Sequence, residues 1–188
     1  MTSLPVVLRI ERWPCVVVGG GRVASRKTRA LLDAGALVTV IAPTVHTSLS
    51  DLELAGRIVV HQRPFVVGDC AGARIVVAAT NDRTVNALVA TESDRVGALV
   101  NRADDAAEGD LAFGAIARTG NITVMVATDG LNPAVARWLR DHVAATMTPT
   151  IERLELILGE GAGLERLSYS EIDELMTGRL IPDREVNS

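Results

Sequence analysis

Apolar residues along this chain are grouped into short uninterrupted runs, rich in valine, that do not alternate with polar residues. Strands that are buried on both faces require continuous apolar runs of this length. The pattern therefore predicts the strands of a parallel sheet, at CVVV (15–18), LVTVIA (37–42), RIVVH (57–61), RIVVAAT (74–80) and GALVN (97–101).

The segments between these runs have the spacing of helices, and glycine follows most of them. Glycine just past a helix supplies the left-handed backbone that closes it at low steric cost. Helices are predicted at about 22–33, 45–55 and 82–95, with a turn around 66–72. This alternation of strands and helices is typical of the doubly wound α/β fold. We therefore predict a Rossmann-like domain over residues 1–110.

The pattern changes after residue 110. LAFGAIAR (111–118) and ITVMVAT (122–128) are predicted to form a β-hairpin around a tight turn at TGN (119–121). A helix follows up to about residue 147, with Asn132 as its N-cap and Pro133 at its first position. Because an isolated hairpin is only marginally stable and leaves edges that can pair, residues 111–148 are predicted to be the dimerisation region of a homodimer.

The end of the chain, residues 149–188, is predicted to be a small helical C-terminal domain. One helix is expected at about 150–159, and the glycines at 159, 161 and 163 then indicate a hinge. Ser168 and Glu171 have the spacing of a capping box before a last helix.

Composition and charge exclude several classes of protein. The net charge of -4 provides no basic face for nucleic acid, so a nucleic-acid partner is not expected. No apolar stretch approaches the ~20 residues that span a bilayer, and the first residues lack a basic leader, which predicts a cytoplasmic protein without a membrane partner. Cys15 and Cys70 form no CxxC pattern and are interpreted as core thiols in a reducing compartment.

The turn after the first strand fits the dinucleotide fingerprint G-x-G-x-x-G/A. In that fingerprint the first glycine allows a sharp turn, the second lets the backbone approach a pyrophosphate, and the last small residue lets the helix pack closely on the sheet. Unpaired helix amides then face the phosphates. A glycine-rich turn without a ligand is the alternative. The predicted coenzyme-binding residues of this turn are Gly19, Gly20, Gly21, Arg22, Val23 and Ala24.

Other strand ends are expected to border the same crevice, because ligands of open α/β sheets bind at the carboxyl ends of the strands. The second strand ends in Ala42 and Pro43, without the acidic residue that would hold the adenosine ribose and without a basic residue for a 2′-phosphate, so charge does not separate NAD from NADP. The other candidates are Thr80, Asn81, Asp82, Asn101, Asp104 and Asp105.

These polar residues also have simpler explanations. Asn81 and Asp82 have the position of helix caps. The residues by themselves favour a solvated acidic loop for Asp104, Asp105, Glu108 and Asp110. His46, His61 and His142 are scattered and there is no Cys cluster, so no resident metal is expected.

Taken together, the motifs resemble the bifunctional precorrin-2 dehydrogenase and sirohydrochlorin ferrochelatase family, whose members occur alone or as the N-terminal part of siroheme synthase. The resemblance covers about residues 4–150 and rests on LPVVLRIERWPCVVVGGGRVASRK, ALVTVIAP, RIVVAATND, VNRADD and MVATDGLNPAVARWLR. It implies that NAD takes a hydride from precorrin-2 while a proton is lost, giving sirohydrochlorin, and that ferrous iron is then inserted as a substrate. It also implies a homodimer.

The resemblance assigns roles to particular residues. It implies that Asp104 is the catalytic carboxylate, which accepts the proton lost during oxidation or takes protons from pyrrole nitrogens as metal enters. The tetrapyrrole side is implied to involve Asp105, Thr128, Gly130 and Asn132.

The chain also departs from the family pattern. Where the family usually reads V-N-V-V-D-D-P, this chain has VNRADDA (100–106), and where the family reads near S-T-G-G-K-S-P, it has ATDGLNP (127–133). In the second segment Asp129 would repel a polycarboxylate macrocycle unless Arg137 or Arg140 offsets its charge. Two alternatives therefore stay open: an NAD-dependent oxidoreductase acting on another small molecule, and a non-catalytic dinucleotide-binding redox sensor.

Overall fold

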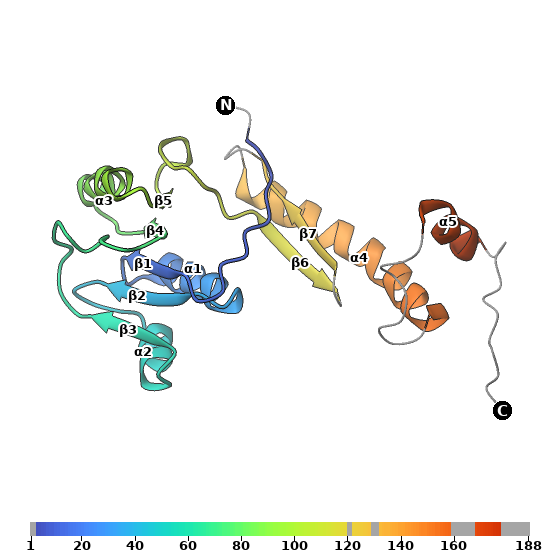
Figure 1. Ribbon diagram of the computed structural model, residues 1–188, viewed down its shortest axis with the longest axis horizontal. Helices are drawn as coiled ribbons and strands as arrows, with labels where there is room; N and C mark the ends of the chain where they lie inside the picture. The colour runs from blue at the N-terminus through green and yellow to red at the C-terminus, as the bar shows by residue number, and fades with distance from the viewer. Residues whose placement is uncertain (1–2, 120–121, 129–131, 159–167, 178–188) are drawn as a thin grey trace. The chain divides into compact units, whose positions relative to one another are not determined.

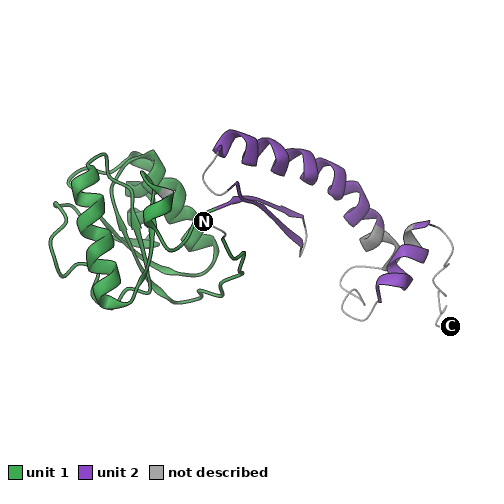
Figure 2. Cartoon of the chain, turned by 90° about the horizontal axis from the view of Figure 1, so that it is seen from above, with its two compact units in different colours: residues 1–113 green, residues 114–188 purple. Residues whose placement is uncertain are grey.

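The protein is described by a computed structural model over residues 3–119, 122–128, 132–158 and 168–177 (Figure 1). The chain forms two compact units, unit 1 over residues 1–113 and unit 2 over residues 114–188 (Figure 2). The predicted boundary after residue 110 lies three residues before the end of unit 1, and the predicted boundary after residue 148 falls inside a helix of unit 2.

Unit 1 contains the predicted parallel sheet. Its strand order is β3-β2-β1-β4-β5, and every neighbouring pair is parallel. The strands are β1 (Pro14–Val18), β2 (Leu37–Ile41), β3 (Ile58–His61), β4 (Ile75–Ala78) and β5 (Leu99–Arg102). The chain adds strands on one side of β1 up to β3 and then returns to the other side for β4 and β5. The point at which the order reverses therefore lies between β1 and β4, where doubly wound sheets bind their ligands.

Helices cover both faces of this sheet, which explains why its strands are continuously apolar. Helices α1 (Arg22–Asp33) and α2 (Thr47–Leu54) pack on the face that carries Cys15 and Val17. Helix α3 (Arg83–Val96) packs on the face that carries Val16 and Val18. Successive side chains of a strand point to opposite faces, so each of the two cores takes alternate residues of β1. The predicted Rossmann-like fold is confirmed.

The connection from β3 to β4 crosses without a helix, as the predicted turn around 66–72 indicates. A buried carboxylate holds it: Glu92 of α3 is 4% exposed and its Oε1 accepts from the Gly68 amide at 2.8 Å and the Cys70 amide at 3.0 Å. Arg63 and Asp69 form a bidentate ion pair across the same loop, with N–O distances of 2.7 and 2.8 Å. The loop is thus fixed by polar contacts.

Cys15 and Cys70 are buried free thiols, as expected of core residues. Desolvation raises the pKa of each thiol to about 11. At neutral pH both therefore stay protonated and unreactive.

Unit 2 begins with the predicted hairpin, formed by β6 (Ala115–Thr119) and β7 (Ile122–Val126). Its turn at residues 120–121 lies outside the described residues, as do the glycines at 159, 161 and 163. One face of the hairpin packs on helix α4 (Pro133–Leu158), and α5 (Tyr169–Thr177) follows. Asn132 caps α4 through its Oδ1, which accepts from the Ala134 amide at 2.8 Å, and Ser168 and Glu171 form the predicted capping box.

The expected break between helices near residue 148 is wrong, because α4 continues through Pro149. Proline removes one backbone donor and crowds the preceding turn. Thr148 donates its hydroxyl to the Ala144 carbonyl at 2.8 Å, which adds a side-chain hydrogen bond beside the missing backbone one. Among the described residues, no helix is both long and apolar enough to cross a membrane.

Candidate functional site: a dinucleotide crevice at the carboxyl ends of the strands

The glycine turn after β1 is closed to side chains at its first two positions. Gly19 has φ +127°, and a Cβ added there would overlap the Ala79 carbonyl oxygen. A Cβ on Gly20 would overlap the carbonyl oxygen of Thr44. The backbone of β1 therefore passes between the ends of β2 and β4 at a distance that only glycine allows.

Gly21 differs because the space in front of it is open. No atom lies within 4 Å of the position its Cβ would occupy. It is the N-cap of α1, has no capping side chain, and no acidic residue lies in the first turn of that helix. The first amides of a helix have no intrahelical partner and carry a partial positive charge. The amides of residues 22–24 are thus suited to the phosphates of a dinucleotide.

The end of β2 lies against the same turn. The His46 amide donates to the Gly20 carbonyl at 2.7 Å. The His46 ring caps α2 and contacts the Ser48 hydroxyl at 2.8 Å, which in turn contacts the Ser25 hydroxyl of α1 at 2.6 Å. Ala42 is buried, and Pro43 is exposed. The residues after β2 offer no carboxylate to a ribose.

The end of β4 is ordered by hydrogen bonds to α3. The Thr80 amide and hydroxyl donate to the Asn86 Oδ1 at 3.1 and 2.8 Å, and the Asn86 Nδ2 returns a bond to the Thr80 carbonyl at 3.2 Å. Asp82 caps α3 through the Thr84 and Val85 amides at 2.8 and 3.3 Å. The helix-cap explanation of Asp82 is confirmed, while Asn81 is exposed in the segment after β4.

The end of β5 carries Asn101, whose side chain is 4% exposed and points into the protein. Its Nδ2 donates to the Leu111 carbonyl at 2.7 Å, and its Oδ1 is buried without a hydrogen-bond partner among the described residues. This residue joins β5 to the segment that leaves unit 1.

Asp104 lies two residues after β5 in an ion pair with Arg102. The Arg102 Nη2 is 2.9 Å from Oδ2 of Asp104, and its Nε is 3.3 Å from Oδ1. Arg83 of α3 adds a longer contact of 3.7 Å. The hydrogen bonds from Arg102 are the main cause that lowers the pKa of the Asp104 carboxyl, and burial opposes them. Asp104 is therefore an ionised, oriented carboxylate.

The other acidic residues of this loop have structural contacts. Asp105 caps the short 3-10 helix η1 (Ala106–Glu108) through the Ala107 amide at 3.3 Å and lies 3.5 Å from Nη2 of Arg83. Asp110 accepts from the Val100 amide at 2.9 Å. Glu108 is largely exposed. The solvated-loop explanation thus fits Glu108 better than Asp104 or Asp110.

Two of the residues assigned to the tetrapyrrole lie together in unit 2. The Thr128 hydroxyl is 3.3 Å from the Asn132 carbonyl oxygen and 3.4 Å from its amide. Asp129 and Gly130 lie outside the described residues. His142 stacks on Trp138 with ring centroids 5.3 Å apart. Among the described residues, no three His, Cys, Asp or Glu side chains gather as a metal ion would require.

Comparison with known proteins agrees with the crevice just described. A family model described as "Putative NAD(P)-binding" matches residues 6–115, which is more than half of the chain. The chain belongs to this NAD(P)-binding family. The predicted binding of a nicotinamide dinucleotide is thereby confirmed, and the open space at Gly21 with the uncapped amides of α1 fits the diphosphate of such a group.

The relatives of this NAD(P)-binding chain also agree with the resemblance inferred from the sequence. It is 43% identical over 143 residues to the siroheme synthase of Methylococcus capsulatus, covering 76% of this chain and 30% of the relative. It is 36% identical over 160 residues to that of Tolumonas auensis, covering 85% and 34%. The chain thus spans about a third of the length of these relatives.

A solved structure described as "SirC, precorrin-2 dehydrogenase" is similar over nearly its whole length. The TM-score is 0.72 and the identity 26%, and the match covers 95% of this chain and 89% of that one. The resemblance to the precorrin-2 dehydrogenase family is confirmed.

Sequence reasoning missed three residues that shape the site. Asn86 is fully buried on α3 and holds Thr80, and a polar residue on the buried face of a predicted helix was the available signal. Arg102 was noticed only as a departure from the family pattern, and its pairing with Asp104 required the backbone geometry after β5. No signal pointed to His46 as the cap of α2.

Proposed function

We propose that this protein oxidises precorrin-2 to sirohydrochlorin with NAD. The observation that supports this most is the match to SirC along nearly all of both chains, since SirC is described as a precorrin-2 dehydrogenase. The relatives that share 36–43% identity with the chain are named siroheme synthases, which agrees with a role in siroheme synthesis. The crevice of unit 1 adds a phosphate cradle and an ionised carboxylate to this support.

The roles of the chain's own residues follow from their positions. The α1 amides behind Gly21 bind the diphosphate, and Gly19 and Gly20 keep the backbone close enough for this. When bound, NAD accepts the hydride that precorrin-2 loses. Asp104 accepts the proton that leaves in the same oxidation, because it is the carboxylate held ionised at the end of β5.

The test is to incubate the full chain with precorrin-2 and NAD without oxygen and to record the tetrapyrrole spectrum and the formation of NADH. We expect sirohydrochlorin and NADH in equal amounts. Binding of NAD in calorimetry without turnover of precorrin-2 would instead indicate another substrate, as the altered segment 127–132 allows. No heat with either NAD or NADP would refute the proposal.

The Asp104→Asn variant tests the role of the carboxylate. Its turnover is expected to fall by about 10²–10⁴-fold, the usual contribution of a general base, while its affinity for NAD stays within threefold of the wild type. Glu108→Gln is the matched control, because Glu108 is 67% exposed on the same loop. Full turnover in Asp104→Asn would show that another group accepts the proton. Ferrous iron insertion is a separate activity implied by the resemblance, and it is measured by adding ferrous iron to sirohydrochlorin.

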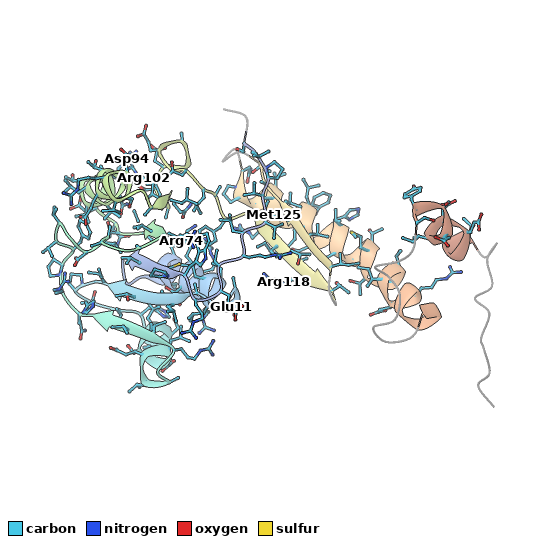
Figure 3. All side chains as sticks on the ribbon, viewed as in Figure 1. Glu11, Arg74, Asp94, Arg102, Arg118 and Met125 are labelled. Carbon is cyan, nitrogen blue, oxygen red and sulfur yellow. The ribbon has the colours of Figure 1, made fainter. Side chains whose placement is uncertain are left out.

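We also propose a homodimer formed through unit 2. The hairpin has only two strands, so each strand has an unpaired edge. Ile116 and Met125 lie opposite each other on its outer face, 37% and 41% exposed. Figure 3 shows Met125 and Arg118 projecting from the hairpin. A second copy would cover this face and pair with these edges.

Sedimentation equilibrium tests the dimer. We expect the wild type to be a dimer and Met125→Glu to shift it to monomer, because the substitution places a charge in the centre of the proposed interface. Thr91→Glu, at an exposed position of α3, is the control and is expected to remain dimeric. A monomeric wild type would refute the assembly.

We also propose that this protein is cytoplasmic, because Cys15 and Cys70 are free thiols. Fractionation of cells tests this localisation.

A further inference from the structure

The carboxylate assigned to proton transfer is held by an arginine from its own strand. Arg102 is the last residue of β5 and is only 8% exposed, and Figure 3 shows it at the end of that strand. Two of its nitrogens contact the two oxygens of Asp104, at 2.9 and 3.3 Å. A guanidinium that contacts both oxygens of a carboxylate fixes the orientation of the carboxylate as well as its charge.

The other groups around Asp104 hold it less firmly. Arg83 of α3 is 75% exposed, and its Nε is 3.7 Å from Asp104 while its Nη2 is 3.5 Å from Asp105. Its charge is therefore screened by water and shared between two carboxylates. Glu108 of η1 lies 4.0 Å from the Nη1 of Arg102, on the side of the guanidinium away from Asp104. Asn86 of α3 is fully buried and uncharged, and it lowers the pKa of Asp104 less than Arg102 does.

We propose that Arg102 is a positioning residue: its guanidinium holds the Asp104 carboxylate ionised and in one orientation at the carboxyl edge of the sheet. The proposal deepens the proposed function and rests on it for its kinetic consequence.

Two consequences follow for a carboxylate that accepts a proton. The ion pair keeps the acceptor form populated to lower pH, because an adjacent arginine lowers the pKa of an aspartate. The direction found for Asp104 agrees with this, with Arg102 as its largest cause. This clamp of Arg102 on Asp104 also restricts rotation of the carboxylate, because Arg102 contacts both of its oxygens. Catalysis should therefore extend to lower pH than it would without Arg102.

The experiment measures the Asp104 carboxyl directly by carbon-13 NMR titration of the full chain, with the resonance assigned from its absence in Asp104→Asn. Arg102→Met removes both contacts and replaces the arginine with an unbranched apolar side chain. We expect the titration midpoint of Asp104 to rise in this variant, because the hydrogen bonds from Arg102 that lower the pKa of Asp104 are lost. Arg83→Met is the matched control and is expected to raise the midpoint less than Arg102→Met does, because the exposed Arg83 is screened by water. The pH profile of precorrin-2 oxidation should shift its acidic limb in the same direction.

The outcomes separate the proposal from simple stability and from the proposed function. Arg102→Lys keeps the charge but cannot contact both oxygens in parallel, and if Arg102→Met does not fold, a smaller upward shift in Arg102→Lys supports the clamp. An unchanged Asp104 midpoint in folded Arg102→Met overturns the proposal for Arg102. A larger shift in Arg83→Met than in Arg102→Met also overturns it. A wild type that never oxidises precorrin-2 overturns the proposed function instead, because the titration needs no substrate.

Discussion

At the scale of single residues, three consecutive glycines have three different physical reasons to be glycine. Gly19 has a backbone conformation that disfavours side chains, and Gly20 lies against a backbone carbonyl. Gly21 is neither strained nor crowded, so its missing side chain leaves space for something outside the protein. Stability and ligand binding are therefore separable within one turn.

Gly21→Asp should keep the fold and lose the coenzyme. Aspartate is a good N-cap and places a negative charge at the positive end of α1, so the free energy of unfolding should rise by a few tenths of a kcal/mol. The same charge would repel the diphosphate, and NAD affinity should fall at least tenfold, about 1.4 kcal/mol. Thermal unfolding and calorimetry measure the two effects.

The neighbouring position provides the contrast. Gly20→Ala should destabilise the fold by roughly 1–3 kcal/mol, because its Cβ would overlap the Thr44 carbonyl. Gly21→Ser is the neutral control and should lose less affinity than Gly21→Asp. A Gly21→Asp protein that binds NAD like the wild type would show that the diphosphate lies elsewhere.

The residue-scale features that the sequence could predict are those set by local spacing. The Asn132 cap and the Ser168–Glu171 box depend on neighbours two or three residues away along the chain, so their patterns are visible in the sequence. The clamp between Arg102 and Asp104 depends on how the chain bends after β5, and the contact of Asn86 with Thr80 depends on packing of α3. These could not be predicted because nothing in local spacing favours them.

At the scale of secondary-structure elements, the buried strands were predictable because each is an uninterrupted apolar run, as a strand covered on both faces requires. Helix α4 was harder, since Pro149 is usually a sign of a helix end. Packing of α4 on the hairpin and the Thr148 hydroxyl bond outweigh that signal here. Helix α1 shows the converse: its span was predicted, but the burial of its one lysine was not.

That lysine predicts a pH dependence of stability. Lys27 is 9% exposed, lies 4.2 Å from the ring centroid of Phe113, and has its pKa lowered to about 8, mainly by burial. Because the unfolded chain has the ordinary value of 10.5, it binds more protons than the folded chain between pH 8 and 10.5. The penalty for burying the charge is thus fully present below pH 8 and is relieved as the pH rises to 10.5.

Lys27→Met should therefore have a higher free energy of unfolding at pH 7, by on the order of 1–2 kcal/mol after loss of the cation–π contact is subtracted. Denaturant unfolding measures this difference. The advantage should shrink between pH 8 and 10.5. The thiols of Cys15 and Cys70 lower stability above pH 9 in both proteins, so the difference between the variants isolates the lysine. Arg29→Met on the exposed face of α1 is the control and should show a difference that does not vary with pH.

At the scale of the whole molecule, the doubly wound order followed from the sequence because each element of unit 1 is specified locally and the connections are short. The end of unit 1 was placed three residues too early relative to Phe113, because Leu111 and Phe113 resemble the first residues of a hairpin strand. In the structure they pack against the core of unit 1. Their contribution to unit 1 can therefore be measured as a difference in the free energy of unfolding between fragments with and without them.

A fragment of residues 1–113 should fold by itself and bind NAD within about threefold of the full chain's affinity. Both core clusters of the sheet draw all their residues from this range, so no part of unit 2 is needed to complete them. The fragment should not oxidise precorrin-2, because the second segment assigned to the tetrapyrrole lies in unit 2. Circular dichroism with denaturant and calorimetry with NAD check these two expectations.

A fragment of residues 1–110 is the matched comparison. It lacks Leu111 and Phe113, leaves the Asn101 Nδ2 without its carbonyl partner, and exposes the hydrophobic surface that both side chains cover. It should be less stable than 1–113 by about 3 kcal/mol, the usual cost of emptying one aromatic site. Equal stability of the two fragments would show that the core of unit 1 closes without these residues, and an unfolded 1–113 would show that unit 2 is required for the sheet to form.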